Sequence, residues 1–214
     1  MTAKITEVSL EHLRLSLKDK MSPKRYNHTL EVEKMAVRLA ELFCPSKTDV
    51  LRAAALLHDI TKEYSVEEQL QICKKFGIIT KRLDILSPKT FHAKTAAALI
   101  PEMYPDFADS EVISAVRFHT TGREGMTLCE ALIYFADYID ESRKFKDCVI
   151  LRNAFWDAHP DLMTEQDRIV LLYRLLVMSF DMTINGLVAE NVPISADTVL
   201  ARNDFICRLS ELSE

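Results

Sequence analysis

Apolar residues recur every three or four positions along most of the chain, which is the spacing of one face of an α-helix. In the segment 5–17 the predicted apolar stripe consists of Val8, Leu10, Leu13, Leu15 and Leu17. In the segment 22–43 it consists of Leu30, Val32, Met35, Leu39 and Leu42. No segment shows the strict alternation of a half-buried strand, so the pattern predicts an all-α protein.

Capping signals mark several helix ends. Ser22 followed by Pro23 indicates a helix N-cap and a proline in the first turn. Ser65 and Glu68 form a capping box, and Gly77 is a C-terminal stop. Together with the periodicity, these signals predict helices at residues 5–17, 22–43, 47–60, 65–77, 89 to about 101, 109–122, 127–145, 147–158, 164–188 and 195–212.

The predicted helices form one domain of residues 1–214. No Gly/Ser/Pro-rich linker and no internal repeat divides the chain, and the connections are mostly short, as in helical bundles. Residues after about 145 carry fewer polar interruptions. We therefore expect a helical bundle at about residues 20–145, with the helices of residues 146–214 packed on its outside.

Composition narrows the function classes. Only four glycines occur in 214 residues, which argues against a Gly-rich phosphate loop. The net charge of −5 disfavours a nucleic-acid partner. The five cysteines form no CxxC pair and are interpreted as free thiols in a reducing cytosol. The N-terminal segment carries charges throughout, and the most apolar run, 169–180, contains Arg174 and is expected to be too short for a membrane span. The sequence predicts a soluble cytoplasmic protein.

Candidate chemistry lies in histidines at predicted helix ends and in two aspartates. Asp137 stands among aromatic and aliphatic residues (IYFADYID), and a buried carboxylate is costly unless it is paired or bound to a cation. Imidazole and carboxylate ligands together suit iron, manganese, zinc, nickel or cobalt, and six of them exceed the needs of one tetrahedral ion. The set predicts two metal ions that share a bridging carboxylate, with the ligands His28, His58, Asp59, His92, His119 and Asp137.

Each of these residues also has a structural interpretation. A single histidine in a helical protein is usually a surface or capping residue, Asp59 can terminate its helix, and Asp137 can pair with a nearby arginine. In that case the chain is an α-helical interaction protein. The order H…HD…H…H…D on apolar helices favours the metal centre instead.

The stretches that carry these residues resemble the HD-domain superfamily of metal-dependent phosphohydrolases. More narrowly, they are similar to the YqeK family, which hydrolyses diadenosine tetraphosphate symmetrically. The matching stretches are KRYNHTLEV (24–32), AALLHDITKEY (54–64), FHAKTAA (91–97), AVRFHTTGREGMTLCEALIYFADYID (115–140) and, more weakly, ADTVLARN (196–203).

The resemblance implies a specific ligand set and reaction. His28, His58, Asp59 and Asp137 would hold one divalent ion, and Asp59, His92 and His119 the other, with iron expected first and manganese, zinc, nickel or cobalt as alternatives. A metal-bridging hydroxide would attack phosphorus and release two ADP. In this interpretation Asp59 and Lys62 are catalytic.

Cations and hydroxyls near these ligands are candidates for binding a polyphosphate. Lys62 lies about one turn beyond Asp59, and Arg25 lies on the helical face of His28. The stretch after His119 offers hydroxyls and open backbone amides for oxyanions. The predicted substrate-binding residues are Arg25, Lys62, Thr120, Thr121, Gly122, Arg123 and Arg143. Tyr26, Phe91 and Phe118 are candidates for adenine stacking or for the core, and His12, His159, Lys24, Glu63 and Glu124 are interpreted as lying outside the site.

Two alternatives within the superfamily stay open: another nucleotide phosphohydrolase, such as a nucleoside monophosphatase or a dNTP hydrolase, and a nucleotide-sensing module without turnover. The chain also departs from the family where Glu-Pro-Asn-Arg commonly follows ADYI. It has DESRKFKD, which keeps Arg143 at the arginine position but alters the loop. The apolar C-terminal helices are compatible with a homodimer.

Overall fold

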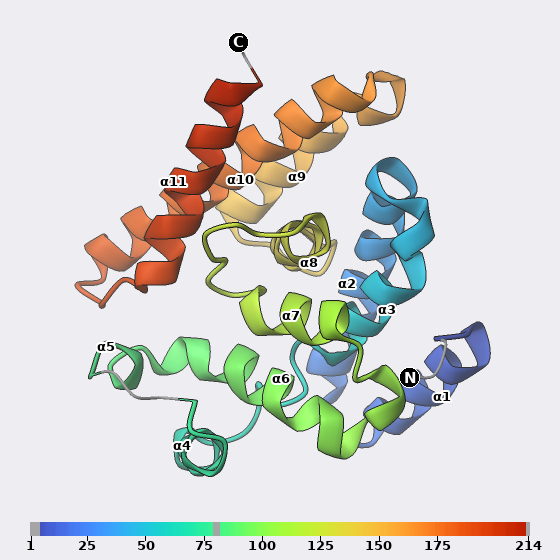
Figure 1. Ribbon diagram of the computed structural model, residues 1–214, viewed down its shortest axis with the longest axis vertical. Helices are drawn as coiled ribbons and strands as arrows, with labels where there is room; N and C mark the ends of the chain where they lie inside the picture. The colour runs from blue at the N-terminus through green and yellow to red at the C-terminus, as the bar shows by residue number, and fades with distance from the viewer. Residues whose placement is uncertain (1–4, 79–81, 213–214) are drawn as a thin grey trace.

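The computed structural model describes residues 5–78 and 82–212, and within these ranges all regular structure is helical (Figure 1). The α-helices are α1 Glu7–Lys18, α2 Pro23–Phe43, α3 Thr48–Leu57, α4 Val66–Lys75, α5 Arg82–Ile85, α6 Phe91–Met103, α7 Ser110–Phe118, α8 Leu128–Ile139, α9 Lys146–Trp156, α10 Glu165–Ala189 and α11 Ala196–Glu211. Short 3-10 helices lie at Pro45–Lys47, Pro88–Thr90, Pro105–Phe107 and Pro160–Leu162. The all-α prediction is confirmed.

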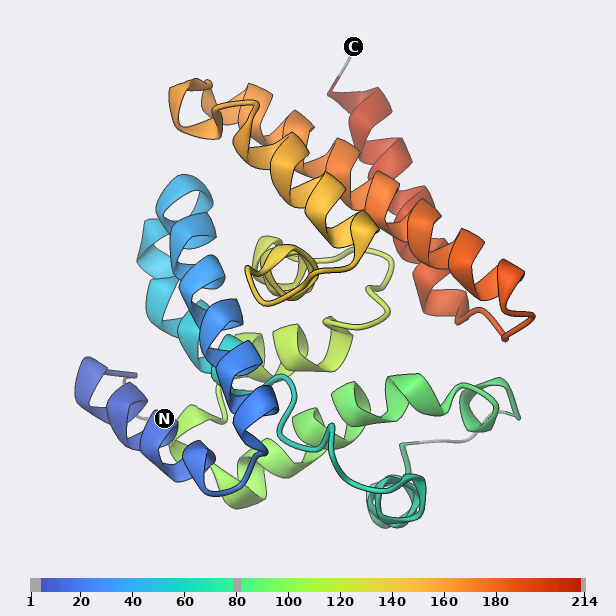
Figure 2. The same cartoon turned by 180° about the vertical axis from the view of Figure 1, so that it is seen from behind.

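Helix α8 lies at the centre of the molecule. It is seen end-on in Figures 1 and 2, with α2, α3 and α7 to one side and α9, α10 and α11 to the other. Most of its residues are buried, and it packs against α2, α3, α7, α9 and α10. A helix that is apolar on nearly every side is stable only when neighbours cover it all round, which explains why Asp137 occurs in such apolar sequence.

The predicted caps are present. The Ser22 hydroxyl accepts a hydrogen bond from the Arg25 amide, with Pro23 in the first turn of α2. Ser65 and Glu68 form the capping box of α4. Gly77, at a φ of +62°, ends that helix, because the amide of Ile78 bonds to the carbonyl of Cys73 at 2.9 Å.

The apolar stripe predicted for the first helix is too broad. Leu10, Leu13 and Leu17 are buried, but the side chains of Val8 and Leu15 are 67% and 57% exposed. Helix α1 lies at the edge of the bundle (Figure 2). It packs on α2 and α3 with one narrow face, so residues beside that face stay in solvent.

Helix α10 spans Glu165–Ala189, which agrees with the predicted helix 164–188 within one residue at each end. It extends over 25 residues, and by length and composition alone it could cross a membrane. The expectation that this region is too short for a span is therefore wrong, and 28% of its apolar window is buried. Here α10 packs against α11 and α9, and Leu172, Leu176 and Phe180 are fully buried.

Helix α8 ends at Ile139, and the prediction that it continues to residue 145 is wrong. The side chain of Asp140 accepts a hydrogen bond from the Ser142 amide at 2.8 Å, which turns the backbone away from the helix. The buried guanidinium of Arg152 on α9 donates to the carbonyls of Ile139 and Asp140. These contacts fix the loop between α8 and α9 beside α2. The 3-10 turns and α5 were not predicted, because such short segments carry no measurable periodicity.

Candidate metal centre

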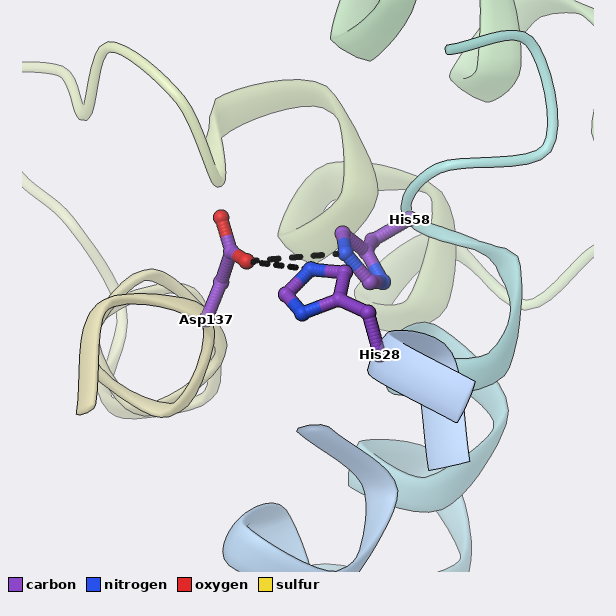
Figure 3. Close-up of side chains that lie close together, drawn as sticks. All are labelled: His28, His58 and Asp137. Atoms are coloured by element: carbon purple, nitrogen blue, oxygen red, sulfur yellow. Dashed lines mark ion pairs between the residues drawn. The ribbon is translucent and has the colours of Figure 1, made fainter. Parts of the chain in front are cut away.

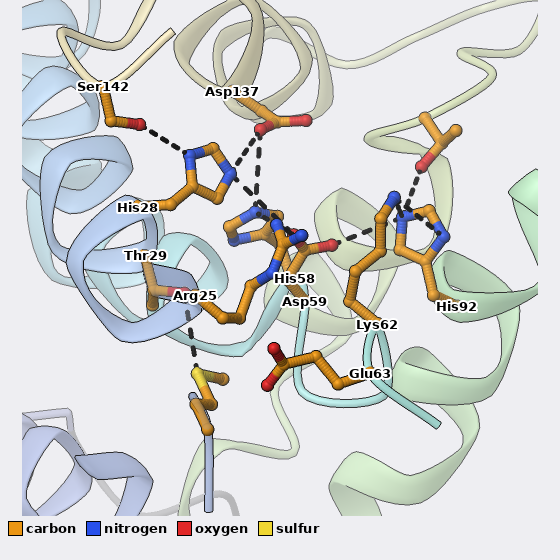
Figure 4. Close-up of polar contacts among 12 residues, drawn as sticks. Arg25, His28, Thr29, His58, Asp59, Lys62, Glu63, His92, Asp137 and Ser142 are labelled. Carbon is orange, nitrogen blue, oxygen red and sulfur yellow. Dashed lines mark hydrogen bonds and ion pairs between the residues drawn. The ribbon is translucent and has the colours of Figure 1, made fainter. Parts of the chain in front are cut away.

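The six predicted ligands converge in one largely buried site, and Figure 4 labels all of them except His119. His28 projects from the second turn of α2, and His58 and Asp59 follow the end of α3. His92 lies in the first turn of α6, His119 ends α7, and Asp137 lies in the last turn of α8. Five separate helices thus bring their side chains to a common point, which the sequence order alone does not guarantee.

Asp59 lies between two groups of imidazoles. Its Oδ2 is 3.4 Å from Nε2 of His58 and 3.8 Å from Nε2 of His28. Its Oδ1 is 3.3 Å from Nε2 of His92 and 3.7 Å from Nε2 of His119. Each oxygen therefore faces its own pair of histidines, as expected of a carboxylate that bridges two ions.

Asp137 completes the first group (Figure 3). Its Oδ1 lies 3.0 Å from Nε2 of His28 and 3.7 Å from Nε2 of His58. The ligand atoms of these three residues lie within 4.8 Å of one another, as do those of His58, Asp59 and His119. On the other side of Asp59, Nε2 of His92 and Nε2 of His119 lie 3.1 Å apart and within 3.7 Å of Oδ1 of Asp59. Each side of Asp59 is therefore compact enough for one ion.

Backbone contacts select the imidazole tautomers. Nδ1 of His58 lies 2.6 Å from the Ala55 carbonyl, and Nδ1 of His119 lies 2.7 Å from the Val116 carbonyl. A carbonyl only accepts, so Nδ1 carries the proton and Nε2 presents its lone pair to the site. Nε2 of His58 and Oδ1 of Asp59 form no hydrogen bond of good geometry with any described residue. Buried acceptors in this state fit a bound cation.

Burial and neighbouring charges set the protonation of the ligands. Burial lowers the pKa of both His92 and His119. Burial raises the pKa of Asp59, but the facing histidines outweigh it and hold that pKa well below its usual range. Burial likewise raises the pKa of Asp137, and the Arg143 guanidinium outweighs it. At neutral pH, His92 and His119 are therefore neutral while Asp59 and Asp137 are ionised, which are the forms that bind metals.

His28 has an additional pair of partners that sequence reasoning missed. Its Nδ1 lies 3.0 Å from the Ser142 hydroxyl and 3.4 Å from Oδ2 of Asp140. Ser142 in turn donates to Asp140. Carboxylates behind a ligating histidine orient the ring and raise its basicity. The signal in the sequence is Asp-Glu-Ser directly after ADYI, at the point where the chain departs from the family pattern.

In the metal-free protein, we expect His28 to stabilise the fold more at pH 6 than at pH 10. Burial lowers its pKa, but contacts with Asp137 and Asp140 outweigh burial and raise it from 6.5 to about 9. The resulting stabilisation is complete below about pH 6.5 and is lost as the pH rises through about 9. His28→Gln should therefore cost roughly 3 kcal/mol more at pH 6 than at pH 10 in urea unfolding.

His12, whose side chain is exposed, provides the control for loss of an imidazole, and His12→Gln should change the free energy of unfolding little. A His28→Gln penalty that does not change with pH would contradict the charged state of His28.

Three predicted cations reach the centre. Nζ of Lys62 lies 3.1 Å from Nε2 of His92, and burial lowers the pKa of this ammonium. Nη1 of Arg25 lies 2.5 Å from Oδ2 of Asp59. Nη2 of Arg143 lies 2.5 Å from Oδ1 of Asp137. Asp137 thus pairs with an arginine, as expected if it were only structural, and also faces two histidines, as expected of a metal ligand.

The turn that carries His58 and Asp59 is held from both sides. The buried Thr61 hydroxyl donates to the His92 carbonyl at 2.9 Å, which ties the turn to α6. The Glu63 carboxylate accepts from the Ser22 amide at 2.8 Å, which ties it to the start of α2. Glu63 lies outside the site, as predicted, but it fixes the position of the ligands.

The stretch after His119 differs from the prediction. The Thr120 hydroxyl lies 3.0 Å from Nε2 of His92 and does border the site. The buried Thr121 hydroxyl donates to the Gly122 carbonyl, and the Gly122 amide donates to the Phe118 carbonyl at 2.8 Å. The expectation of an open amide at Gly122 is therefore wrong, because the backbone turn at the end of α7 consumes it.

Arg123 pairs with Glu130 at 3.1 Å, and no contact with the ligands is present for it among the described residues. Phe91 is 1% exposed and belongs to the core. His12 and His159 are exposed and lie outside the centre. Thus Arg25, Lys62, Thr120 and Arg143 border the centre, whereas Thr121, Gly122 and Arg123 are occupied by contacts of their own.

Gly122 has a packing role instead. Its φ is +63°, and a Cβ at this position would lie 2.8 Å from the Phe180 ring and 2.9 Å from Cβ of Ala201. We expect Gly122→Ala to destabilise the protein by about 2–4 kcal/mol in chemical denaturation.

Gly77→Ala is the matched control for this variant, because Gly77 has a φ of +62° but no neighbouring atom within 4 Å. It should cost only the backbone strain of about 1 kcal/mol. Equal losses in the two variants would contradict the packing role of Gly122.

A helical bundle that joins an adjacent His-Asp pair to three further histidines and a distant aspartate defines an HD-type metal protein. The family model described as "HD domain" matches residues 25–142, and the chain belongs to this family. Proteins of this family bind divalent metal ions, and the six converging side chains supply suitable ligands.

Similarity to curated proteins indicates which members of the HD-domain family this chain resembles. A Bacillus subtilis protein named "Bis(5'-nucleosyl)-tetraphosphatase, symmetrical" is 33% identical over 87% of this chain and 92% of its own length. A Staphylococcus aureus protein of the same name is 35% identical over 64% of this chain and 69% of its own length. A crystal structure from Clostridium acetobutylicum, described as an HD superfamily hydrolase involved in NAD metabolism, has a TM-score of 0.80 at 33% identity. It covers 92% of this chain and 97% of its own.

Proposed function

We propose that this protein is a metal-dependent hydrolase that splits diadenosine tetraphosphate symmetrically into two ADP. The observation that carries the proposal is the placement of four imidazole Nε2 atoms around the two oxygens of Asp59. The names of the bacterial relatives supply the substrate. The neighbouring cations fit a substrate that carries several negative charges.

The proposed ligand sets share Asp59. One set consists of His28, His58, Asp59 and Asp137, and the other of Asp59, His92 and His119. Divalent ions held by these residues would supply activation of a water molecule and neutralisation of phosphate charge. We propose iron as the native metal, with manganese, zinc, nickel and cobalt as alternatives suited to the same ligands.

The protein's own cations orient the phosphate chain. Arg25 and Arg143 lie on one side of the ligands and Lys62 on the other, so a chain of phosphates that passes the centre meets positive charge on both sides. When water attacks one of the two central phosphorus atoms, the bond to the central bridging oxygen breaks. Because burial lowers the pKa of Lys62, its ammonium is suited to give a proton to the departing ADP oxygen. The Thr120 hydroxyl supplies a further polar contact.

The product pattern tests this reaction. Purified protein with its metal content measured should convert diadenosine tetraphosphate to ADP alone. Release of inorganic phosphate from nucleoside monophosphates, or of tripolyphosphate from dNTPs, would instead identify another HD-domain nucleotide phosphohydrolase. Nucleotide binding without turnover would identify a sensing module.

The remaining assignments are proposals of the same kind. We propose a single domain of residues 1–214, in the cytoplasm, that acts without a nucleic-acid or membrane partner. The exposed apolar positions of α10 and α11, such as Val188, Val199 and Leu200, are compatible with a homodimer. Light scattering of the purified chain would establish its oligomeric state.

A further inference from the structure

A groove of about 900 Å³ opens beside the metal centre, between the start of α2 and the loop from α8 to α9. This size is within the range of small-molecule sites. His28 forms its inner end, so the groove leads directly to the first group of ligands. Its walls include Lys24, Arg25, Asn27, Arg143, Lys144 and Phe145.

The groove carries a positive balance of charge. Its two acidic residues are engaged elsewhere: Glu31 pairs with Lys34 at 2.6 Å, and Glu141 lies 3.4 Å from Arg152. Four cations line the groove. Arg25 and Arg143 are paired with the ligand carboxylates Asp59 and Asp137, while Lys24 and Lys144 are exposed, and Nζ of Lys144 donates to the Glu141 carbonyl at 2.8 Å. Positive charge beside a metal centre fits a phosphate chain.

Phe145 supplies an aromatic surface on the same groove. Its side chain is 70% exposed, and it stands at the N-cap of α9 with an extended backbone. A single exposed ring needs no explanation by itself, but this ring shares a groove with four cations and the Asn27 amide. An aromatic face beside cations is the combination that binds a nucleobase and its phosphates.

We propose that this groove binds one ADP half of the dinucleotide, with the base stacked on Phe145 and the outer phosphate of that half held by Lys24 and Lys144. The proposal rests on the proposed function, because the central phosphates must then lie at the metal centre. It also gives a role to Lys24, which sequence reasoning left on the solvated surface.

Binding of ADP and of pyrophosphate to the metal-loaded protein, measured by calorimetry, tests the groove. Phe145→Ala should weaken ADP binding about tenfold, because it removes the stacked base contact, and should change pyrophosphate binding less than twofold. Phe145→Trp should retain ADP binding. Leu162→Ala, which removes an 81% exposed side chain elsewhere, should change neither.

The two lysines are tested with the same probes. The double variant Lys24→Ala and Lys144→Ala should weaken ADP and pyrophosphate binding alike, by about tenfold, and should reduce the salt dependence of both. Lys75→Ala is the control, since Lys75 is exposed and pairs with Glu102 on another face.

Absent ADP binding, or equal ADP affinity in the wild type and Phe145→Ala, would overturn the groove even if diadenosine tetraphosphate is hydrolysed normally. Conversely, Phe145-dependent ADP binding by a protein that does not hydrolyse the dinucleotide would support the groove and refute the proposed reaction. The two proposals can therefore fail separately.

Discussion

Asp59→Ala is expected to lose metal and hydrolytic activity together. Its two carboxylate oxygens face separate pairs of histidines, so one substitution removes a ligand from both proposed ions. Activity on diadenosine tetraphosphate should fall by a factor of roughly 10³ or more, because metal activation of water and charge neutralisation disappear together. Elemental analysis should find fewer than half of the ions bound by the wild type.

The same change leaves the Arg25 guanidinium without its carboxylate, and an unpaired charge in a buried site can destabilise the fold. Asp59→Asn therefore accompanies it, since the amide keeps the shape and one acceptor oxygen but loses the charge. Asp161→Ala, on the exposed turn before α10, is the control and should keep metal and activity. A folded Asp59→Asn protein with the wild-type metal content would refute the bridging assignment.

Lys62→Met should keep both metal ions and reduce turnover by about 100-fold. The lysine lies beside His92 without serving as a ligand, so its loss removes a proton donor and a phosphate contact rather than the centre itself. Methionine preserves most of the side-chain length without the charge. The expected signature is a lower kcat with unchanged metal content, together with loss of the alkaline limb of the pH profile.

Lys75→Met, which breaks only an exposed pair with Glu102, should leave these kinetics unchanged. If Lys62→Met turns over the dinucleotide at the wild-type rate, then Lys62 has no part in the reaction. If Lys62→Met loses its metal instead, then Lys62 stabilises the metal centre rather than donating a proton.

The loop after ADYI, residues 140–145, keeps its contacts with the candidate metal ligands. The chain has Asp140, Glu141 and Ser142 directly after ADYI. Asp140 and Ser142 reach Nδ1 of His28, and Arg143 reaches Asp137. Arg152 binds the loop carbonyls and holds this arrangement in place. The loop therefore supports a ligand at one end and forms a wall of the groove at the other.

The sequence by itself determined the features that depend on near neighbours along the chain. Helix periodicity, the Ser22 and Ser65 caps and the Gly77 stop act within a few residues, so each can be read locally. The ligand types could also be predicted, because a carboxylate among aromatic residues, such as Asp137, requires a compensating charge wherever the helix packs.

Only the tertiary structure decided which of these positions face one another. Val8 and Leu15 fit a helical stripe but stay in solvent, because α1 packs with one narrow face. The Gly122 amide is consumed by the end of α7 rather than offered to a ligand. Contacts between residues more than 100 positions apart, such as His28 with Ser142, depend on how whole helices pack. Periodicity carries no information about that packing. The bridging role of Asp59 was implied by the family resemblance, but neither the contacts of His28 with Asp140 and Ser142 nor the groove at Phe145 could be derived before the chain was folded.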